Sequence, residues 1–319
     1  MSAAGRFGAP ALLAALCLIA LAGGCARREN PAEAVVPNSD RDPAVSRRDL
    51  PAADQGITVL CYHYFSDHPA PVRALRAAGA VLLGLPLVND VETWTTPAGQ
   101  FERQLALLAQ RGYQSLDLDA LLAVAEGRAP LPERAVVLTF DDGDRSIHTI
   151  AWPLLRKYGF KGVLFIVDSW VDGVGTPPEL NVMSWAEIRE LAASGDFDVQ
   201  SHSHALHYKT WHEDAYYAVA EVLDWLEAPE ALARVDADLR ESRRVLRERL
   251  GVEPRYLAWP YGSATARTDS IARAAGFSAS FGLRFGHVGN EDGSPMSLPR
   301  YAITARTSPT LFVHLLGED

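Results

Sequence analysis

The sequence lacks an apolar run long enough to cross a membrane. The apolar segment near its start, from about Ala9 to Ala22, is shorter than the roughly 20 residues that a spanning helix needs. Arg6 precedes this segment, and a basic residue before a short apolar core is typical of a secretory signal peptide. The chain also lacks internal repeats, coiled-coil heptads and nucleic-acid-binding motifs, so we expect no nucleic acid among its partners.

Cysteine is scarce, with three residues in the whole chain. The stretch Leu21-Ala22-Gly23-Gly24-Cys25 resembles a bacterial lipobox, whose cysteine is lipidated and becomes the mature N-terminus. We therefore expect residues 1–24 to be a lipoprotein signal peptide, with cleavage of an ordinary secretory signal nearby as the alternative. If Cys17 leaves with the signal and Cys25 carries lipid, Cys61 has no cysteine to pair with, which excludes an intrachain disulfide.

The residues after the signal predict where the protein works. Ala26 follows the lipobox cysteine, and by similarity to Gram-negative lipoproteins this predicts sorting to the outer membrane. We expect the protein on the periplasmic face of the cell envelope, held to the membrane by its N-terminal lipid. Residues 25–56 contain this cysteine and a stretch without apolar periodicity, which predicts a flexible tether spanning about 30 Å.

Residues 57–319 are long enough to form one large α/β domain. Stretches that favour strands alternate with stretches that favour helices. The predicted strands are Ile57–Tyr62, Ala135–Phe140, Gly162–Val167 and Phe197–Gln200, and the predicted helices are Pro97–Arg111, Ile147–Tyr158 and Trp185–Ser194. This alternation favours a parallel sheet covered by helices, with the reactive side chains at the carboxyl ends of the strands.

Two clusters of polar side chains follow predicted strands. Asp141 and Asp142 come directly after an apolar run, and two neighbouring buried carboxylates disfavour each other's ionisation unless a cation neutralises one of them. His202, His204 and His207 follow the strand that ends near Gln200. One carboxylate with two histidines is a common open metal site, so we expect a bound metal ion.

These motifs resemble those of the polysaccharide deacetylases of the NodB-homology type, carbohydrate esterase family 4. The three family motifs are matched in order by Thr139–Gly143, by His202-Ser203 with His207, and by Trp259–Gly262. The chain is most similar to the branch that acts on poly-β-1,6-N-acetylglucosamine, and the resemblance covers most of residues 57–305. It implies a distorted (β/α)7-type barrel and a metal-dependent N-deacetylase.

The resemblance also implies the ligands of the metal. Asp142 matches the family's carboxylate ligand, and His202 matches the first histidine. The five-residue spacing of the poly-N-acetylglucosamine branch places the second histidine at His207. Residues five apart on a helix lie about 140° apart, so this pair requires a strand end followed by a turn. His204 is the alternative ligand, or a residue that contacts substrate. The expected metal is zinc, with cobalt, nickel and iron as alternatives.

Catalytic roles follow from the same resemblance. Asp141 matches the catalytic base, which accepts a proton from the attacking water, and the backbone N–H of Tyr261 matches a donor to the oxyanion. Two residues match an acid that protonates the leaving amine. His63, after Tyr62, fits the poly-N-acetylglucosamine branch, whereas His314 fits the late motif of most other members. We prefer His63, because His314 lies in the last few residues of the chain.

One position departs from the family pattern. Many relatives have an arginine just before motif three that holds the catalytic aspartate, and here Ala258-Trp259 stands in its place. Arg300 is the candidate to replace it. Without a replacement the chain would be a non-catalytic polysaccharide-binding lipoprotein, which is the alternative from another functional class.

The substrate is implied by the resemblance alone. We expect an N-acetylated polysaccharide of a biofilm matrix, with peptidoglycan or chitooligosaccharides as alternatives and a polysaccharide export machinery as a partner. Trp259 and Tyr261 are candidates to stack on sugar rings, and the alternative is that they pack in the core, as aromatic residues near a barrel mouth often do. Two further segments look like additions to the family domain: residues 70–88, predicted as an extra or membrane-contacting helix, and residues 212–234, predicted as a helical scaffold.

Overall fold

The structure is a computed structural model. It describes residues 56–68, 91–213, 215–226, 228–289 and 294–318. The predicted signal peptide, Cys25, nearly all of the tether and the segment 70–88 lie outside the described residues. No helix in the described part of the chain is long and apolar enough to cross a membrane.

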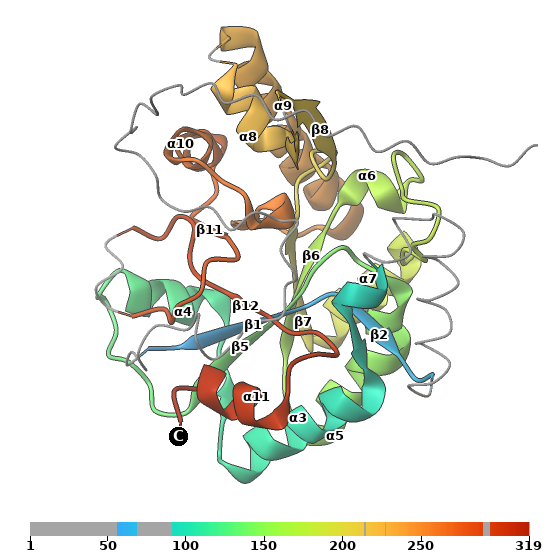
Figure 1. The fold of residues 1–319 in the computed structure, drawn as a ribbon, viewed down its shortest axis with the longest axis vertical. Coiled ribbons are helices and arrows are strands. Elements are labelled where there is room, and N and C mark those ends of the chain that lie inside the picture. Colours follow the sequence, from blue (N-terminus) through green and yellow to red (C-terminus); the bar gives the residue numbers. More distant parts are fainter. Residues whose placement is uncertain (1–55, 69–90, 214, 227, 290–293, 319) are drawn as a thin grey trace, which may run out of the picture. The chain divides into compact units, whose positions relative to one another are not determined.

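An eight-stranded parallel sheet forms the centre of the domain (Figure 1). The strand order is β11-β10-β7-β6-β5-β1-β12, and β4 also pairs with β5. The strands are β1 (Thr58–Tyr62), β4 (Gln114–Ser115), β5 (Ala135–Phe140), β6 (Gly162–Ile166), β7 (Phe197–Ser201), β10 (Tyr256–Ala258), β11 (Ala279–Phe281) and β12 (Tyr301–Ala302). Strands such as β5 are apolar along nearly their whole length because both faces of the sheet are covered.

The sheet curls until its two edges meet. An isolated parallel bridge joins Phe281 of β11 to Leu298, which lies just before β12. The amide of Leu298 donates to the carbonyl of Ser280 at 2.8 Å, and the amide of Gly282 donates to the carbonyl of Leu298 at 2.9 Å. The prediction of a distorted (β/α)7-type barrel is confirmed.

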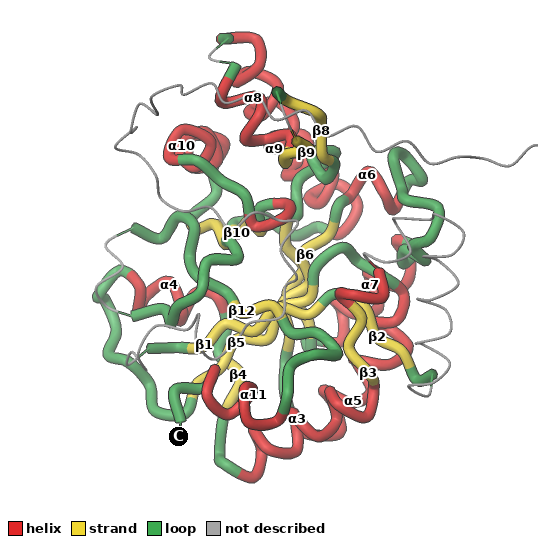
Figure 2. The backbone as a smooth tube through the Cα atoms, in the orientation of Figure 1, coloured by secondary structure: helices red, strands yellow, loops and turns green. Residues whose placement is uncertain are grey.

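Helices surround this sheet, as the tube drawing shows (Figure 2). They are α3 (Ala98–Gln110), α4 (Leu118–Ala125), α5 (Trp152–Tyr158), α6 (Asp168–Val171), α7 (Trp185–Ser194), α8 (Val219–Trp225), α9 (Pro229–Leu250), α10 (Ala266–Ala275) and α11 (Pro309–Leu315). The predicted helix Ile147–Tyr158 begins as a π-helical turn, η2 (Ile147–Ala151), before α5. Ser184 and Glu187 form a capping box that starts α7.

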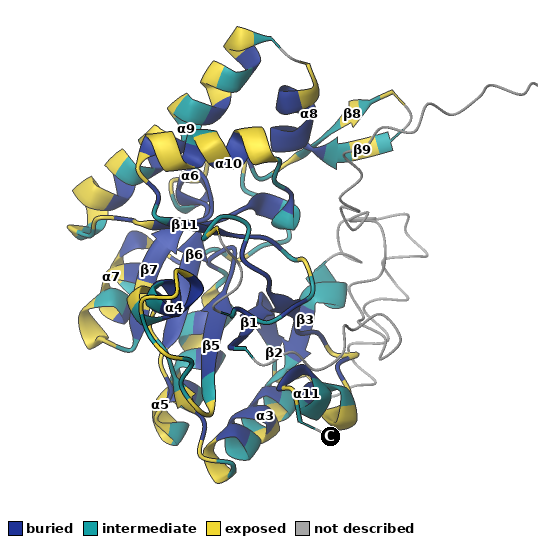
Figure 3. Ribbon diagram, turned by 90° about the vertical axis from the view of Figure 1, so that its left-hand side faces the viewer, coloured by how far each residue is buried: buried dark blue, intermediate teal, exposed yellow. Residues whose placement is uncertain are grey.

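Side chains alternate between the two faces of the strands, as the pleat of a sheet requires. Leu60 and Leu138 pack with the surrounding helices α3, α5, α7 and α11, whereas Val59 and Val137 pack in a second cluster with α4. The strands are accordingly buried along their length in Figure 3. Because both faces are packed, the positions of the strand ends are fixed. The side chains that directly follow the strands are therefore held in place as well.

Two small sheets lie outside the barrel. β2 (Tyr64–Ser66) pairs with β3 (Thr95–Pro97) in parallel, and β8 (Lys209–His212) pairs with β9 (Ala215–Ala218) as an antiparallel hairpin. The prediction that residues 212–234 form a purely helical scaffold is wrong for its first part, because β9 precedes α8 there. Tertiary contacts of Tyr217 and His212 with Trp225 hold this hairpin against α8.

Candidate metal centre

Asp142 is the common neighbour of two histidines at the carboxyl ends of the strands. It lies two residues after β5, in a left-handed backbone conformation with φ of 72°. Its Oδ1 atom lies 3.4 Å from Nε2 of His202 and 3.2 Å from Nε2 of His207. Asp142 and His202 are buried, and His207 is nearly so. The structure thus brings together the three predicted ligands.

A turn after β7 produces the five-residue spacing of the histidines. His202 directly follows β7, and Ser203 has a left-handed φ of 70° that ends the extended chain. The loop then returns, so that the rings of His202 and His207 have centroids 5.0 Å apart. Nδ1 of His202 donates to the carbonyl of Ala258 at 2.7 Å. This hydrogen bond fixes the ring so that its Nε2 atom faces Asp142, as is usual for histidine ligands.

These residues fit a divalent cation. Oδ2 of Asp142 accepts a hydrogen bond from the hydroxyl of Tyr64 at 2.5 Å, whereas Oδ1 is buried without a hydrogen-bond partner. A buried carboxylate oxygen without a donor is unfavourable unless a cation faces it. Burial raises the pKa of Asp142, but His207 and His202 hold it well below its usual range. Two imidazole nitrogens and one carboxylate are ligands that zinc accepts with a position left open.

Asp141 makes a different contact. Two guanidinium nitrogens of Arg300 donate to its two carboxylate oxygens, each at 2.8 Å, and both side chains are fully buried. Nε of Arg300 donates to the carbonyl of Gly282 at 3.0 Å, which fixes the guanidinium plane. Burial raises the pKa of Asp141, but the charges of Arg300, His202 and His63 and the hydrogen bonds from Arg300 together outweigh this effect, and the net pKa is lowered. Arg300 therefore holds Asp141, as expected of a replacement for the arginine that is missing before motif three.

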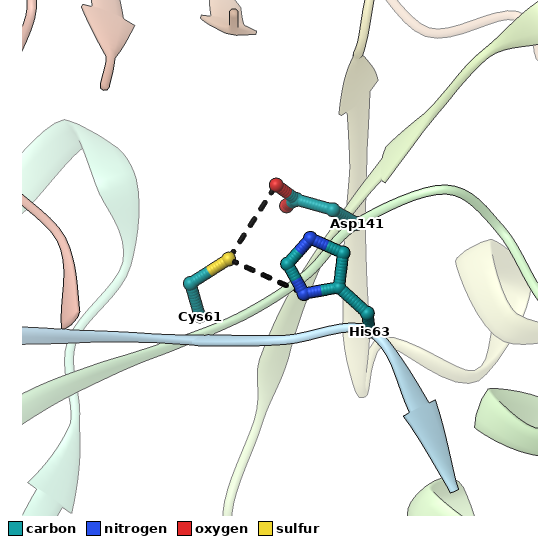
Figure 4. A group of neighbouring side chains, drawn as sticks. All are labelled: Cys61, His63 and Asp141. Atoms are coloured by element: carbon teal, nitrogen blue, oxygen red, sulfur yellow. Dashed lines mark hydrogen bonds between the residues drawn. The ribbon is translucent and has the colours of Figure 1, made fainter. Parts of the chain in front are cut away.

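His63 lies beside Asp141, immediately after β1 (Figure 4). The nearest polar atoms of Cys61, His63 and Asp141 lie within 4.8 Å of one another. The thiol of Cys61 donates to Oδ2 of Asp141 at 3.5 Å and lies 3.9 Å from Nδ1 of His63. Burial lowers the pKa of His63, so burial favours its neutral form. The ring of Trp94 packs on that of His63 at 4.3 Å between centroids.

The alternative acid, His314, lies at the other end of β1. It belongs to α11, whose residue Leu315 accepts a hydrogen bond from the hydroxyl of Thr58 at 3.0 Å. Thr58 begins β1, whereas His63 follows the last residue of that strand. Of the two candidates, His63 is therefore the one that the fold places beside Asp141.

Tyr261 lies next to the second histidine. It belongs to the short helix η3 (Pro260–Gly262) and has a left-handed φ of 59°. Its ring centroid lies 4.5 Å from that of His207, and Nζ of Lys209 lies 5.1 Å from the centre of the Tyr261 ring. The ring of Trp170 packs on His207 at 4.7 Å.

The predicted sugar contact of Trp259 is wrong, and the alternative metal ligand His204 lies outside the cluster, whereas a contact of His204 with substrate stays a prediction. Trp259 is fully buried, and its Nε1 donates to Asp269 at 2.8 Å, so its side chain belongs to the core and cannot stack on a sugar. His204 is not in the metal cluster, because the turn at Ser203 directs it elsewhere: its Nδ1 bonds the buried Asp168. His204 instead lines a pocket of about 450 Å³ beside α9.

One residue of the site went unrecognised in the sequence. The hydroxyl of Tyr64 donates to the carboxylate of Asp142, the predicted metal ligand. The sequence feature that could have identified Tyr64 is its position directly after Tyr62-His63. The chain bends between β1 and β2, and that bend brings the Tyr64 hydroxyl to Asp142.

Comparisons with known proteins agree with this geometry. Residues 128–280 match the family model for polysaccharide deacetylases, and this range contains both aspartates and both histidines of the cluster. Residues 128–280 form a polysaccharide deacetylase domain. The family predicted from the three motifs is therefore confirmed.

Relatives of this deacetylase include named enzymes. The poly-beta-1,6-N-acetyl-D-glucosamine N-deacetylase of Escherichia coli K12 is 26% identical over 274 residues, which cover 79% of this chain and 37% of the relative. The chain thus spans little more than a third of that protein. The enzyme of the same name from Staphylococcus aureus MRSA252 is 24% identical over 281 residues, covering 88% of each chain.

Solved structures share the fold of the deacetylase. The structure of IcaB from Ammonifex degensii superposes with a TM-score of 0.65 and 28% identity, and covers 82% of this chain and 98% of the other. A de-N-acetylase from Aggregatibacter actinomycetemcomitans superposes with a TM-score of 0.63 at 21% identity, covering 82% and 99%. The second likeness concerns the fold alone.

Proposed function

We propose that this deacetylase is a metal-dependent hydrolase that removes N-acetyl groups from an N-acetylglucosamine polysaccharide and releases acetate. The observation that carries the proposal is the juxtaposition of Asp142, His202 and His207 with a second buried carboxylate, Asp141, that is held by Arg300. The names of the relatives support poly-β-1,6-N-acetylglucosamine as the polymer. The retained residues disfavour a chain that binds polysaccharide without turnover.

Asp142, His202 and His207 would hold the metal, with zinc as the proposed ion. When bound, a divalent cation polarises the acetamide carbonyl and lowers the pKa of water in the site. Tyr64 holds the second oxygen of Asp142, and Ala258 holds the far nitrogen of His202. These contacts keep the ligands in place before the cation arrives.

Asp141 acts as the general base. Arg300 keeps this carboxylate ionised and fixes both of its oxygens, so it can accept the proton of a water that attacks the acetamide carbon. Positive charge at the developing oxyanion lowers the barrier, and a good hydrogen-bond donor contributes about 3 to 4 kcal/mol. We assign one such donor to the backbone N–H of Tyr261.

His63 acts as the general acid. An amine leaves poorly unless it is protonated, so the reaction needs a proton donor beside the base. His63 is the candidate because it lies beside Asp141 at the carboxyl end of β1. Burial lowers the pKa of His63, whereas the charges of Asp142 and Asp141 act in the opposite direction and favour the protonated form that an acid needs. Asp141 thus accepts a proton from the attacking water, and His63 donates a proton to the nitrogen of the leaving amine.

The cellular setting is also part of the proposal. The lipobox supports a lipoprotein on the periplasmic face of the outer membrane, and the polymer named for the relatives supports a role in a biofilm matrix next to export machinery. The negative net charge of −10 suits a product that gains amino groups and becomes cationic.

Defined oligomers test the substrate. The full chain should release acetate from β-1,6-linked N-acetylglucosamine oligomers, with a mass loss of one acetyl group per event. The β-1,4-linked oligomers of the same length should react much more slowly. Equal or faster release from the β-1,4 series would replace the proposed polymer by peptidoglycan or chitooligosaccharides.

A further inference from the structure

The hairpin β8–β9 carries a pair of exposed aromatic side chains close to the metal centre. Trp211 and Tyr216 face each other across the two strands and are 58% and 57% exposed. Their ring centroids lie 5.3 Å apart in an edge-to-face arrangement. Figure 3 shows the hairpin beside α8, projecting from the domain with partly and fully exposed residues along its strands. Neighbouring exposed aromatics of this size commonly mark an interaction site.

The two faces of the hairpin have different neighbours. Side chains alternate along a strand, so Trp211 shares a face with Lys209, and His212 points to the other face. That other face is covered, because His212 and Tyr217 both contact Trp225 of α8, with centroid distances of 5.7 Å and 4.8 Å. Helix α8 therefore packs against one face of the hairpin and leaves Trp211 and Tyr216 on the opposite one.

The exposed face is continuous with the metal centre. β8 begins two residues after His207, and Nζ of Lys209 lies over the ring of Tyr261, which in turn packs on His207. Lys209 lies on the same face of the hairpin as Trp211 and Tyr216. This face therefore contacts Tyr261 at Lys209 and carries Trp211 and Tyr216 farther along the strands. A chain of linked sugars with one unit at the metal centre would pass over these rings.

We propose that Trp211 and Tyr216 form an aromatic platform that binds pyranose rings of the polysaccharide beyond the unit being deacetylated. This inference rests on the proposed function and adds a polymer-binding site to it. Sugar rings present C–H groups on their faces and hydroxyls at their edges. Aromatic rings pack on such faces while the indole N–H and the phenol hydroxyl remain available at the rim for hydrogen bonds.

A lipid surface is a poorer match for this patch. Binding to acyl chains requires a broad apolar face, whereas the exposed face of the hairpin carries two aromatic rings beside the charged Lys209. The platform is also narrow, with two rings on one face of a short hairpin. We therefore commit to the polysaccharide and treat vesicle binding as an outcome of the test.

The test compares β-1,6-linked N-acetylglucosamine oligomers of increasing length as substrates of the full chain. In the wild-type protein KM should fall as the oligomer becomes long enough to reach the hairpin. Trp211→Ala should raise KM for long oligomers about fivefold to tenfold, with kcat and the KM for the shortest oligomer unchanged, which matches the usual contribution of an aromatic contact. Hydrolysis of a phenyl acetate should also be unchanged, because it needs no polymer.

Two further Trp211 variants separate ring stacking from apolar contact. Trp211→Phe should retain most of the length dependence, whereas Trp211→Leu, which is apolar but has no flat ring, should lose it. Tyr158→Ala is the matched control, since Tyr158 ends α5, which leads into the amino end of β6 and away from the metal centre. This control should keep the wild-type length dependence.

Several results would overturn the platform. They are an unchanged length dependence in Trp211→Ala, a Leu variant that behaves like the Phe variant, or loss of phenyl acetate hydrolysis, which would indicate a structural role. Trp211-dependent binding of the Cys25→Ser chain to phosphatidylglycerol vesicles, with KM for oligomers unchanged, would reassign the patch to the membrane. Failure of the proposed function is distinguishable, because the wild-type protein would then release no acetate from an oligomer of any length.

Discussion

The two adjacent aspartates have different partners, and this difference assigns them different roles. Asp142 faces two histidines with an oxygen that lacks a hydrogen-bond donor, whereas both oxygens of Asp141 are held by Arg300. Removing one partner of a buried ion pair leaves an uncompensated charge and typically costs 3 to 5 kcal/mol. Arg300 is therefore a positioning residue for the base as well as part of the core.

Substitution of Arg300 should affect turnover more than metal binding. Arg300→Lys retains the charge but not the two parallel hydrogen bonds, so kcat should fall by about 10² while the metal content stays at the wild-type level. The hydrogen bonds from Arg300 help to lower the pKa of Asp141, so their loss should raise this pKa and move the acid limb of the kcat/KM profile to higher pH in this variant. Wild-type kcat with an unshifted profile would show that Asp141 does not depend on Arg300.

His63 should matter only when the leaving group needs a proton. His63→Ala should lose kcat for acetamides by about 10² to 10⁴, the usual contribution of a general acid, and should lose much less on a phenyl acetate, whose phenolate leaves unaided. Kinetics on the two substrates with metal content measured in parallel provide the check. His314→Ala is the matched control and should alter neither reaction, since α11 contacts the start of β1. Selective loss of amide cleavage in His314→Ala, with His63→Ala active, would reverse the assignment.

At the level of elements, the loop after β7 positions the two histidines of the predicted metal site. The amides of His204 and Ala205 donate to the two carboxylate oxygens of Asp238 on α9, at 2.9 Å and 2.8 Å. This loop separates His202 from His207, so α9 fixes the path by which the second histidine returns. A helix outside the barrel thereby supports the geometry of the centre.

Loss of this support should weaken metal binding. Asp238→Ala leaves two amides without acceptors, at about 1 to 3 kcal/mol each, and frees the loop. Zinc affinity should fall by about 10- to 100-fold, the usual effect of removing a group that orients a ligand, as measured by competition with a chelating dye. Asp236→Ala, on the same helix but in an exposed pair with Arg240, should bind zinc like the wild-type protein. Equal zinc affinity in the two variants would show that metal binding does not depend on the contact between Asp238 and the loop.

Elements with a clear apolar pattern could be predicted from the sequence. Elements that depend on tertiary contacts could not. The strand Ala135–Phe140 was predicted to the residue, because a buried parallel strand is apolar throughout. The hairpin β8–β9 was not predicted, because its strands are held by contacts with Trp225 rather than by alternation. The capping box at Ser184 shows the opposite case, a local signal that marks the start of α7 reliably.

The same distinction applies to the site. Asp142, His202 and His207 were predicted from their resemblance to the family motifs, with the position of Asp142 and His202 after predicted strands as support. The burial of Trp259 could not, since an aromatic residue near a barrel mouth has the same sequence pattern whether it packs inward or faces substrate. The contact between Arg300 and Asp141 spans 159 residues and forms only when the sheet closes.

At the level of the whole molecule, the proposed anchor and the proposed catalytic residues belong to separate segments. The catalytic residues lie in the described domain, whereas the predicted lipid site, Cys25, lies in the segment before it. A tether of the predicted length would allow the domain to reach polymer some distance from the membrane surface.

Anchoring should therefore be removable without loss of activity. Cys25→Ser should move the protein from the membrane fraction to the soluble periplasm, because each buried CH₂ of an acyl chain contributes about 0.8 kcal/mol to membrane binding. Fractionation followed by immunoblotting provides the measurement, with acetate release assayed on the purified protein. Cys17→Ser is the control and should stay in the membrane fraction. Membrane retention of Cys25→Ser would assign anchoring to the uncleaved signal or to residues 70–88.

The most direct test of the account is acetate release from β-1,6-linked oligomers before and after removal of the metal. Chelation should abolish release in the wild-type protein, and Zn²⁺, Co²⁺ or Ni²⁺ should restore it, with one ion bound per chain. His202→Ala should bind no ion and stay inactive, whereas His204→Gln, altered two residues away and outside the cluster, should regain activity like the wild-type protein. A His202→Ala protein that holds one ion per chain and releases acetate at the wild-type rate would contradict the proposed centre.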